Sequence, residues 1–254
     1  MKVSVFNICS DALDMLKFST YYATENAYNP FDYVLILWNP SEEVQCWATS
    51  NAKVLATHYG NEKTPILKDE MHIYYYETKK DLDFIQNLRN CFNLGFEKSF
   101  EFNDYAAGIN TDMCFYMGWL ANLVKYAAKD SIINCRQIEP GVYPTLHETL
   151  NCGKPTEEEF EIDKFYDYCS QLYSDKLITE KEWGKRADAT PHLMHKKIWE
   201  EFGPWDPKRL ADVEFFNRCK EGGIKNMKSL GSLVYHFGRC ETEQRERRGD
   251  YGKI

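Results

Sequence analysis

The run FDYVLILW at Phe31–Trp38 constrains the fold more than any other feature of this sequence. Seven of its eight residues are uncharged, and all seven are aliphatic or aromatic. A continuous apolar run of this length is typical of a central parallel strand, which is buried on both faces. Such a strand needs neighbouring strands on each side and helices above and below it, so the run predicts an α/β fold.

The first 140 residues supply those neighbours, because strand-like and helix-like patterns alternate along them. We expect strands at Lys2–Cys9, Phe31–Trp38, Met71–Glu77, Tyr105–Ile109 and Ser131–Gln137. We expect helices at Asp11–Asn26, over a short stretch from Ser41, at Asp81–Lys98 and at Tyr116–Lys129. This alternation predicts a mostly parallel central sheet that is covered by helices on both faces.

The pattern changes after Gly141, and we expect a smaller second half over residues 141–236. Thr156 with Glu159 three residues later is a capping-box signature for the helix that follows. We further expect a strand at Ala189–Met194, helices at Lys196–Phe202 and Asp212–Glu221, and a last strand at Lys228–His236. Residues 237–254 are polar and are expected to be a mobile tail. The whole chain, 1–254, is then one domain with halves at 1–140 and 141–236.

Composition excludes several classes of protein. The chain carries 31 Lys and Arg against 39 Asp and Glu, a net charge of −8, which argues against a protein that binds DNA phosphates. No apolar run approaches the length of a membrane span, and the first residues do not resemble a secretory leader. The nine cysteines show no pair with zinc-ribbon spacing. They are expected to be reduced and mostly buried in a cytoplasmic protein.

Polar residues follow several of the expected strands. In open α/β sheets, ligands bind beyond the carboxyl ends of the strands. The sequence therefore places a ligand near Asn7–Ser10, Trp38–Ser41 and Asn110–Asp112.

These strand ends belong to an ordered series of motifs along the chain. Asn110-Thr111-Asp112 ends the fourth strand, and Gly203-Pro204-Trp205-Asp206, Ala211-Asp212-Val213-Glu214, Gly222-Gly223 and Val234-Tyr235-His236 follow in that order. The series resembles the family-2 glycosyltransferases of the GT-A fold over nearly the whole chain. Their pattern is a strand ending in D-x-D, a G-G-F-D turn, an E-D-x-D-L-x-x-R helix, a glycine, and a strand ending in V-x-H.

The resemblance implies a GT-A fold with a nucleotide-sugar-binding half at 1–140 and an acceptor-side half at 141–236. It implies an enzyme that transfers a sugar, with inversion, from a nucleotide-diphosphate sugar to an acceptor hydroxyl. UDP is the default nucleotide, and Mn²⁺ or Mg²⁺ is the implied cofactor. A glycan or a lipid-linked acceptor fits the acidic chain better than duplex DNA, although a nucleic-acid base is a further possible acceptor.

The resemblance also assigns roles to residues on the donor side. Asp112 and His236 are the implied metal ligands, and Asn110 meets either the ribose or a metal-bound water. The other residues implied to bind the donor are Asn7, Cys9, Asn39, Arg89, Thr111 and, from the tail, Arg239. Structural alternatives stay open. Asp112 could cap the following helix, His236 and Arg89 could be structural, and Arg239 could belong to a solvated tail of mixed charge.

On the acceptor side, the resemblance makes Asp212 the general base that takes the proton of the acceptor hydroxyl. Glu214 is the alternative carboxylate, and Asp212 could also simply cap its helix. Trp205 and Asp206 are implied to contact the acceptor.

Three positions depart from the family pattern. Asn110 replaces the first carboxylate of D-x-D, Trp38-Asn39 replaces the acidic residue that usually ends the second strand, and Ala211 replaces the glutamate of E-D. These departures motivate the alternative of a non-catalytic module that binds a glycan or a nucleotide sugar. A sugar nucleotidylyltransferase is disfavoured, because Asn7–Ser10 lacks the glycine-rich basic loop that such an enzyme needs after its first strand.

Overall fold

The computed structural model describes residues 1–58, 71–140, 148–154, 156, 158–179, 191–206 and 211–237. The strands are β1 (Val3–Cys9), β2 (Phe31–Trp38), β3 (Met71–Tyr76), β4 (Tyr105–Asn110), β5 (Met113–Phe115), β6 (Ser131–Glu139), β7 (Glu148–Thr149), β8 (Leu177–Thr179), β9 (His192–His195) and β10 (Lys225–His236). The helices are α1 (Leu13–Glu25), α2 (Glu42–His58), α3 (Phe84–Ser99), α4 (Trp119–Val124), α5 (Ile162–Leu172), α6 (Lys196–Phe202) and α7 (Ala211–Glu221). None of these described helices is long and apolar enough to cross a membrane.

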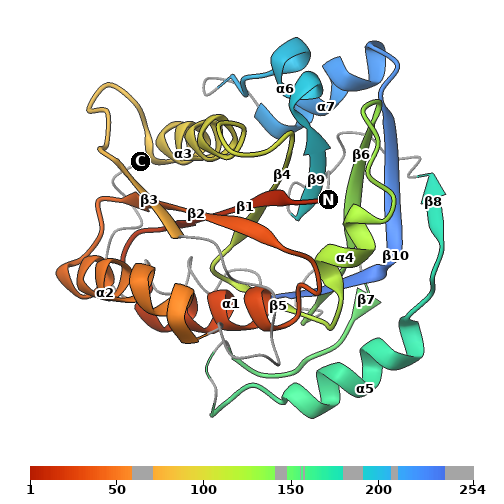
Figure 1. Ribbon diagram of the computed structural model, residues 1–254, viewed down its shortest axis with the longest axis horizontal. Helices are drawn as coiled ribbons and strands as arrows, with labels where there is room; N and C mark the ends of the chain where they lie inside the picture. The colour runs from red at the N-terminus through yellow and green to blue at the C-terminus, as the bar shows by residue number, and fades with distance from the viewer. Residues whose placement is uncertain are drawn as a thin grey trace.

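One sheet of ten strands forms the centre of the described molecule (Figure 1). Eight of them follow in the order β3-β2-β1-β4-β9-β6-β10-β5, while β7 pairs with β6 and β8 pairs with β10. Strands β3, β2, β1 and β4 form a parallel block, and β6 and β10 are parallel to each other. Strand β9 joins these two groups by pairing antiparallel with both β4 and β6. The predicted α/β class and the mostly parallel sheet are confirmed.

Helices cover both faces of this sheet. In Figure 1, α1 and α2 lie below it, and α3, α6 and α7 lie above it. Strand β1 shows why both faces are apolar. Val3 and Val5 pack in the cluster between the sheet and α1. Phe6 and Ile8 pack in the cluster between the sheet and α3. A third cluster, which includes Phe165, packs α5 against β10. The alternation along each strand therefore buries side chains in two layers at once.

Helix α3 approaches the sheet closely at the ring of Phe6. A Cβ atom placed on Gly95 would lie 2.3 Å from that ring, and one placed on Gly108 would lie 2.6 Å from it. Neither position can therefore carry a side chain without displacing a fully buried aromatic ring. The two glycines let α3 and β4 enclose Phe6 from both sides.

The boundaries of some expected elements differ from the observed ones. Helix α4 starts only at Trp119, because residues 113–115 pair with β10 and Gly118 adopts a left-handed φ of 75°. The Thr156 hydroxyl accepts a hydrogen bond from the Glu159 amide at 3.1 Å, but this bond closes a turn before α5 begins. Helix α2 has 17 residues, whereas a short helix was expected there. Strands β5, β7 and β8 were not expected, because two or three residues are too few to show a periodicity.

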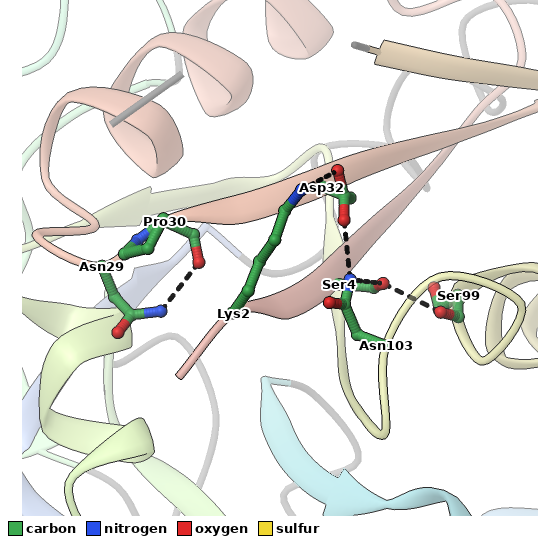
Figure 2. Close-up of polar contacts among 7 residues, drawn as sticks. All are labelled: Lys2, Ser4, Asn29, Pro30, Asp32, Ser99 and Asn103. Carbon is green, nitrogen blue, oxygen red and sulfur yellow. Dashed lines mark hydrogen bonds and ion pairs between the residues drawn. The ribbon is translucent and has the colours of Figure 1, made fainter. Parts of the chain in front are cut away.

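Polar side chains join the elements at the amino-terminal edge of the parallel strands (Figure 2). Lys2 Nζ lies 2.9 Å from Asp32 Oδ1, and Asn103 Nδ2 donates to Asp32 Oδ2 at 2.7 Å. Asn103 also donates to the Ser4 hydroxyl, which in turn donates to the Ser99 carbonyl at 2.8 Å. This amino-edge network ties the starts of β1 and β2 to the end of α3.

Candidate functional site

Three strands bring the two implied metal ligands together at the opposite, carboxyl-terminal edge. Asp112 lies in the turn between β4 and β5, and β5 pairs antiparallel with β10 so that Met113 is opposite His236. Strands β6 and β10 run parallel and end at Glu139 and His236. The pairing therefore places Asp112, His236 and Glu139 side by side, although they are far apart in the sequence.

His236 lies between two carboxylates. Its Nε2 atom is 3.3 Å from Asp112 Oδ2, and its Nδ1 atom is 3.0 Å from Glu139 Oε1. Burial disfavours the charged imidazolium, but the carboxylates of Asp112 and Glu139 outweigh burial and raise the pKa of His236 to about 10. The two carboxylates therefore favour the protonated ring near neutral pH.

This donor set suits a small divalent cation. Metal–ligand bonds of 2.0–2.1 Å hold neighbouring ligand atoms about 3 Å apart, close to the observed distance between Nε2 and Oδ2. Among the described residues, no group of three or more His, Cys, Asp or Glu side chains is arranged to hold a metal. Two protein ligands are sufficient for Mg²⁺ or Mn²⁺ in sites where waters and substrate phosphates complete the coordination shell. Asp112 and His236 therefore fit the implied cofactor.

Asn7 does not point to the surface. It is fully buried, and its Nδ2 atom donates to the Tyr33 hydroxyl at 3.1 Å and lies 3.5 Å from the Ser19 hydroxyl. Ser19 in turn donates to the main-chain carbonyl of Asn110 at 3.0 Å. Burial raises the pKa of Tyr33 to about 12, so this hydroxyl stays neutral. The chain of contacts supports the end of β4 directly before Asp112, and sequence reasoning missed Ser19 and Tyr33.

Three of the other implied donor-binding residues lie at the ends of neighbouring strands. Cys9 ends β1 and is buried, as is Thr111. Asn39 follows β2 with a left-handed φ of 43°, and its amide pairs with the Thr78 hydroxyl. Arg89 lies half-buried on α3. Arg239 is outside the described residues, whereas Phe237, the first residue of the expected tail, is buried.

The two acceptor-side residues, Trp205 and Asp206, differ in burial. Trp205 is 3% exposed and stacks on Phe92 at 5.1 Å between ring centroids. The Asn93 side chain both accepts from the Trp205 amide and donates to its carbonyl. Asp206 follows and is half-buried. Trp205 thus packs in the core.

The two candidate bases lie on α7. Asp212 is the second residue of this helix, and its side chain is outside the described residues. Glu214 lies half-buried on the same helix. Their roles stay predictions.

Glu139 is the functional candidate that the sequence did not reveal. The expected strand ended at Gln137, whereas β6 continues to Glu139 before Pro140. The sequence around Glu139 contains no motif that marks it. Glu139 becomes a candidate only once β6 is known to lie parallel to β10, because this pairing brings it to His236.

Comparison with solved structures identifies the fold. No family model matches the sequence, and a search of curated proteins also finds no match. The structure resembles GalNAc-T7 with UDP, GalNAc and Mn²⁺ at a TM-score of 0.61 and 11% identity, covering 92% of this chain and 43% of that one. It resembles S. aureus TarS 1–349 at a TM-score of 0.60 and 8% identity, covering 98% and 64%.

A third neighbour is the mannosyltransferase PcManGT from Pyrobaculum calidifontis in complex with GDP-Man and Mn²⁺. The TM-score is 0.55 at 10% identity, over 98% of this chain and 61% of that one. All three are GT-A glycosyltransferases, so the GT-A fold implied by the motifs is confirmed. This chain spans less than two thirds of the length of each neighbour.

Proposed function

We propose that this chain is a glycosyltransferase that uses a nucleotide-diphosphate sugar and a divalent cation, and that it is related to family 2. The observation that supports the proposal most is the pairing of Asp112 with His236 at the carboxyl edge of a GT-A sheet. GalNAc-T7 with UDP and PcManGT with GDP-Man both contain Mn²⁺. We keep UDP as the default nucleotide, and GDP as the alternative that an assay must include.

In the proposed mechanism, Asp112 and His236 would hold the cation. Asn110, the last residue of β4, and Thr111 directly precede Asp112. When bound, the cation neutralises the negative charge that develops on the departing diphosphate. Asn39 and Arg89 line the donor side in this proposal. Cys9 is buried at the end of β1, and Asn7 acts from within by supporting the end of β4 through Ser19. Arg239 would add a positive charge from the tail, where Arg suits contact with a diphosphate.

Asp212 serves as the general base in this proposal. It accepts the proton of the acceptor hydroxyl while that oxygen attacks the anomeric carbon from the side opposite the diphosphate, which gives inversion. Its position in the first turn of α7 favours the ionised carboxylate, because the helix N-terminus carries a partial positive charge. Glu214 is the second candidate base. Asp206 marks the proposed acceptor side, and Trp205, which is buried directly before it, supports that side from the core. We place the reaction in the cytoplasm with a glycan, lipid-linked or other hydroxyl acceptor.

A non-catalytic module that binds nucleotide sugars is the second candidate function. Two positions favour it, because Asn110 and Ala211 stand where the family pattern has carboxylates. Such a module would keep the cation and nucleotide site but would not break the bond between sugar and diphosphate.

A panel of UDP- and GDP-sugars with and without Mn²⁺ separates the two functions. Binding is read from thermal stability, since a ligand at 100 times its Kd stabilises the folded state by about 2.7 kcal/mol. Turnover is read from release of free nucleotide, which an enzyme produces slowly by transfer to water even without an acceptor. We expect Mn²⁺-dependent binding and nucleotide release for at least one donor. Binding without release supports the module, and no Mn²⁺-dependent binding contradicts both functions.

A further inference from the structure

We propose that Glu139 is a positioning residue that sets the orientation and the tautomer of His236 for cation binding. The inference rests on the proposed function, because it concerns how the Asp112–His236 pair is prepared for its cation. Neither the motif series nor the family pattern includes a residue at this position.

The geometry of the ring contacts carries the inference. Glu139 Oε1 lies 3.0 Å from His236 Nδ1, on the side of the ring opposite Asp112. A carboxylate at this position accepts a hydrogen bond from Nδ1–H, which directs the lone pair of a neutral imidazole to Nε2. A histidine that binds a metal commonly donates its other ring N–H to a carboxylate or a carbonyl in this way. Nε2 then faces Asp112, the other implied ligand.

The strands make this arrangement rigid. Glu139 and His236 end the neighbouring parallel strands β6 and β10, so their separation is set by backbone hydrogen bonds. The Phe237 amide also donates to the Asp112 carbonyl at 2.9 Å, which holds the Asp112 turn against the end of β10. The three side chains are 14–25% exposed, which leaves them within reach of a ligand while restricting their rotamers. Sites on such elements are more precise than sites on loops.

Removal of Glu139 has a specific consequence for the ring. Without an acceptor at Nδ1, the tautomer with its proton on Nε2 gains relative stability, because Nε2–H donates directly to Asp112. In that tautomer, both implied ligand atoms, His236 Nε2 and Asp112 Oδ2, are engaged in one hydrogen bond with each other. A cation takes the place of the Nε2 proton and therefore needs the ring protonated on Nδ1 alone, and that form of the ring loses its hydrogen-bond acceptor when Glu139 is removed.

Mn²⁺ affinity in the presence of UDP tests the inference, with free Mn²⁺ measured by electron paramagnetic resonance. The variants are Glu139→Ala, Glu139→Gln and Asp112→Ala. Glu101→Gln is the matched control, because Glu101 is a carboxylate paired with Lys98 at the far edge of the sheet. We expect Glu139→Ala to weaken Mn²⁺ binding by about 10–100-fold. Glu139→Gln should lie between Glu139→Ala and wild type, because its amide oxygen still accepts from Nδ1–H.

The outcomes distinguish this inference from the proposed function. Wild-type affinity in Glu139→Ala overturns the inference alone, provided that Asp112→Ala loses Mn²⁺. Losses in Glu139→Ala and Glu139→Gln as complete as in Asp112→Ala overturn it too, because Glu139 would then be a ligand. A wild-type protein that binds no Mn²⁺ with any donor nucleotide overturns both. Metal-free thermal unfolding of each variant shows that a loss of affinity is not a loss of fold, and partial rescue by Gln is a result that a general packing defect does not produce.

Discussion

The two edges of the parallel sheet carry polar clusters of opposite character. At the amino-terminal edge, one Lys2 ammonium meets one Asp32 carboxylate, and Asn103 and Ser4 complete the hydrogen bonds (Figure 2). The cluster is electrically balanced within itself. A cleft of about 490 Å³ also opens at this edge, beside Lys2, Asn103 and Lys196.

The carboxyl-terminal edge is unbalanced by comparison. There, two carboxylates from Asp112 and Glu139 meet a single imidazole, so that even the protonated ring balances only one of the two negative charges. A buried or half-buried excess of negative charge is costly unless a cation compensates it. The comparison teaches that the charge balance of a polar cluster distinguishes a structural network from a candidate binding site.

The largest expected effect belongs to the reaction and not to stability. Asp212→Asn retains the size of the side chain, but it removes the proposed general base. We expect the rate of sugar transfer to fall by about 10²–10⁴-fold with little change in donor affinity. The measurement is kcat for transfer beside the Kd of the donor in both proteins. If donor affinity collapses instead, Asp212 belongs to the metal site, and if neither constant changes, Glu214 becomes the base to test.

Asp32→Ala sharpens the comparison from the amino-terminal edge. It leaves the Lys2 ammonium and one Asn103 donor without their acceptor, so we expect the free energy of unfolding to fall by about 1–3 kcal/mol. Affinity for Mn²⁺ and nucleotide should stay at the wild-type value. Urea unfolding and calorimetry on the same samples check both statements, and a large loss of Mn²⁺ affinity would break the distinction between the two edges.

The smallest effect is expected at an exposed ion pair of the amino-terminal edge. Glu101→Gln removes the partner of Lys98, and the Glu101 side chain is 51% exposed. Surface pairs of this kind are worth about 0.2–1 kcal/mol, so we expect the free energy of unfolding to change by no more than about 1 kcal/mol. A fall in the free energy of unfolding as large as that of Asp32→Ala would contradict this expectation. It would show that the partly buried Lys2–Asp32 pair and the exposed Lys98–Glu101 pair contribute equally to stability.

The sequence predicted the strands that are apolar on both faces, and with them the α/β class. Strand β2 was predicted with its observed bounds, because its continuous apolar run can be read from consecutive residues. Strand β9 was expected, but its antiparallel place between β4 and β6 was not, because pairing between distant segments leaves no local periodicity. Glu139 was missed for the same reason, because its place beside His236 depends on the pairing of β6 with β10. Asp112 and His236 were linked by resemblance, and only the pairing of β5 with β10 explains physically why they meet.

Calorimetric titration of UDP, repeated with GDP, into wild type and Asp112→Ala, with and without Mn²⁺, tests the central claim most directly. The account predicts that the wild-type protein binds at least one of the two nucleotides tightly only when Mn²⁺ is present. It predicts that Asp112→Ala weakens this binding by about 100-fold or more, roughly 2.8 kcal/mol, while its metal-free unfolding stays close to that of wild type. Equal Mn²⁺-dependent affinity in the two proteins would contradict the account, because the carboxylate at the edge of the sheet would then play no part in binding the donor.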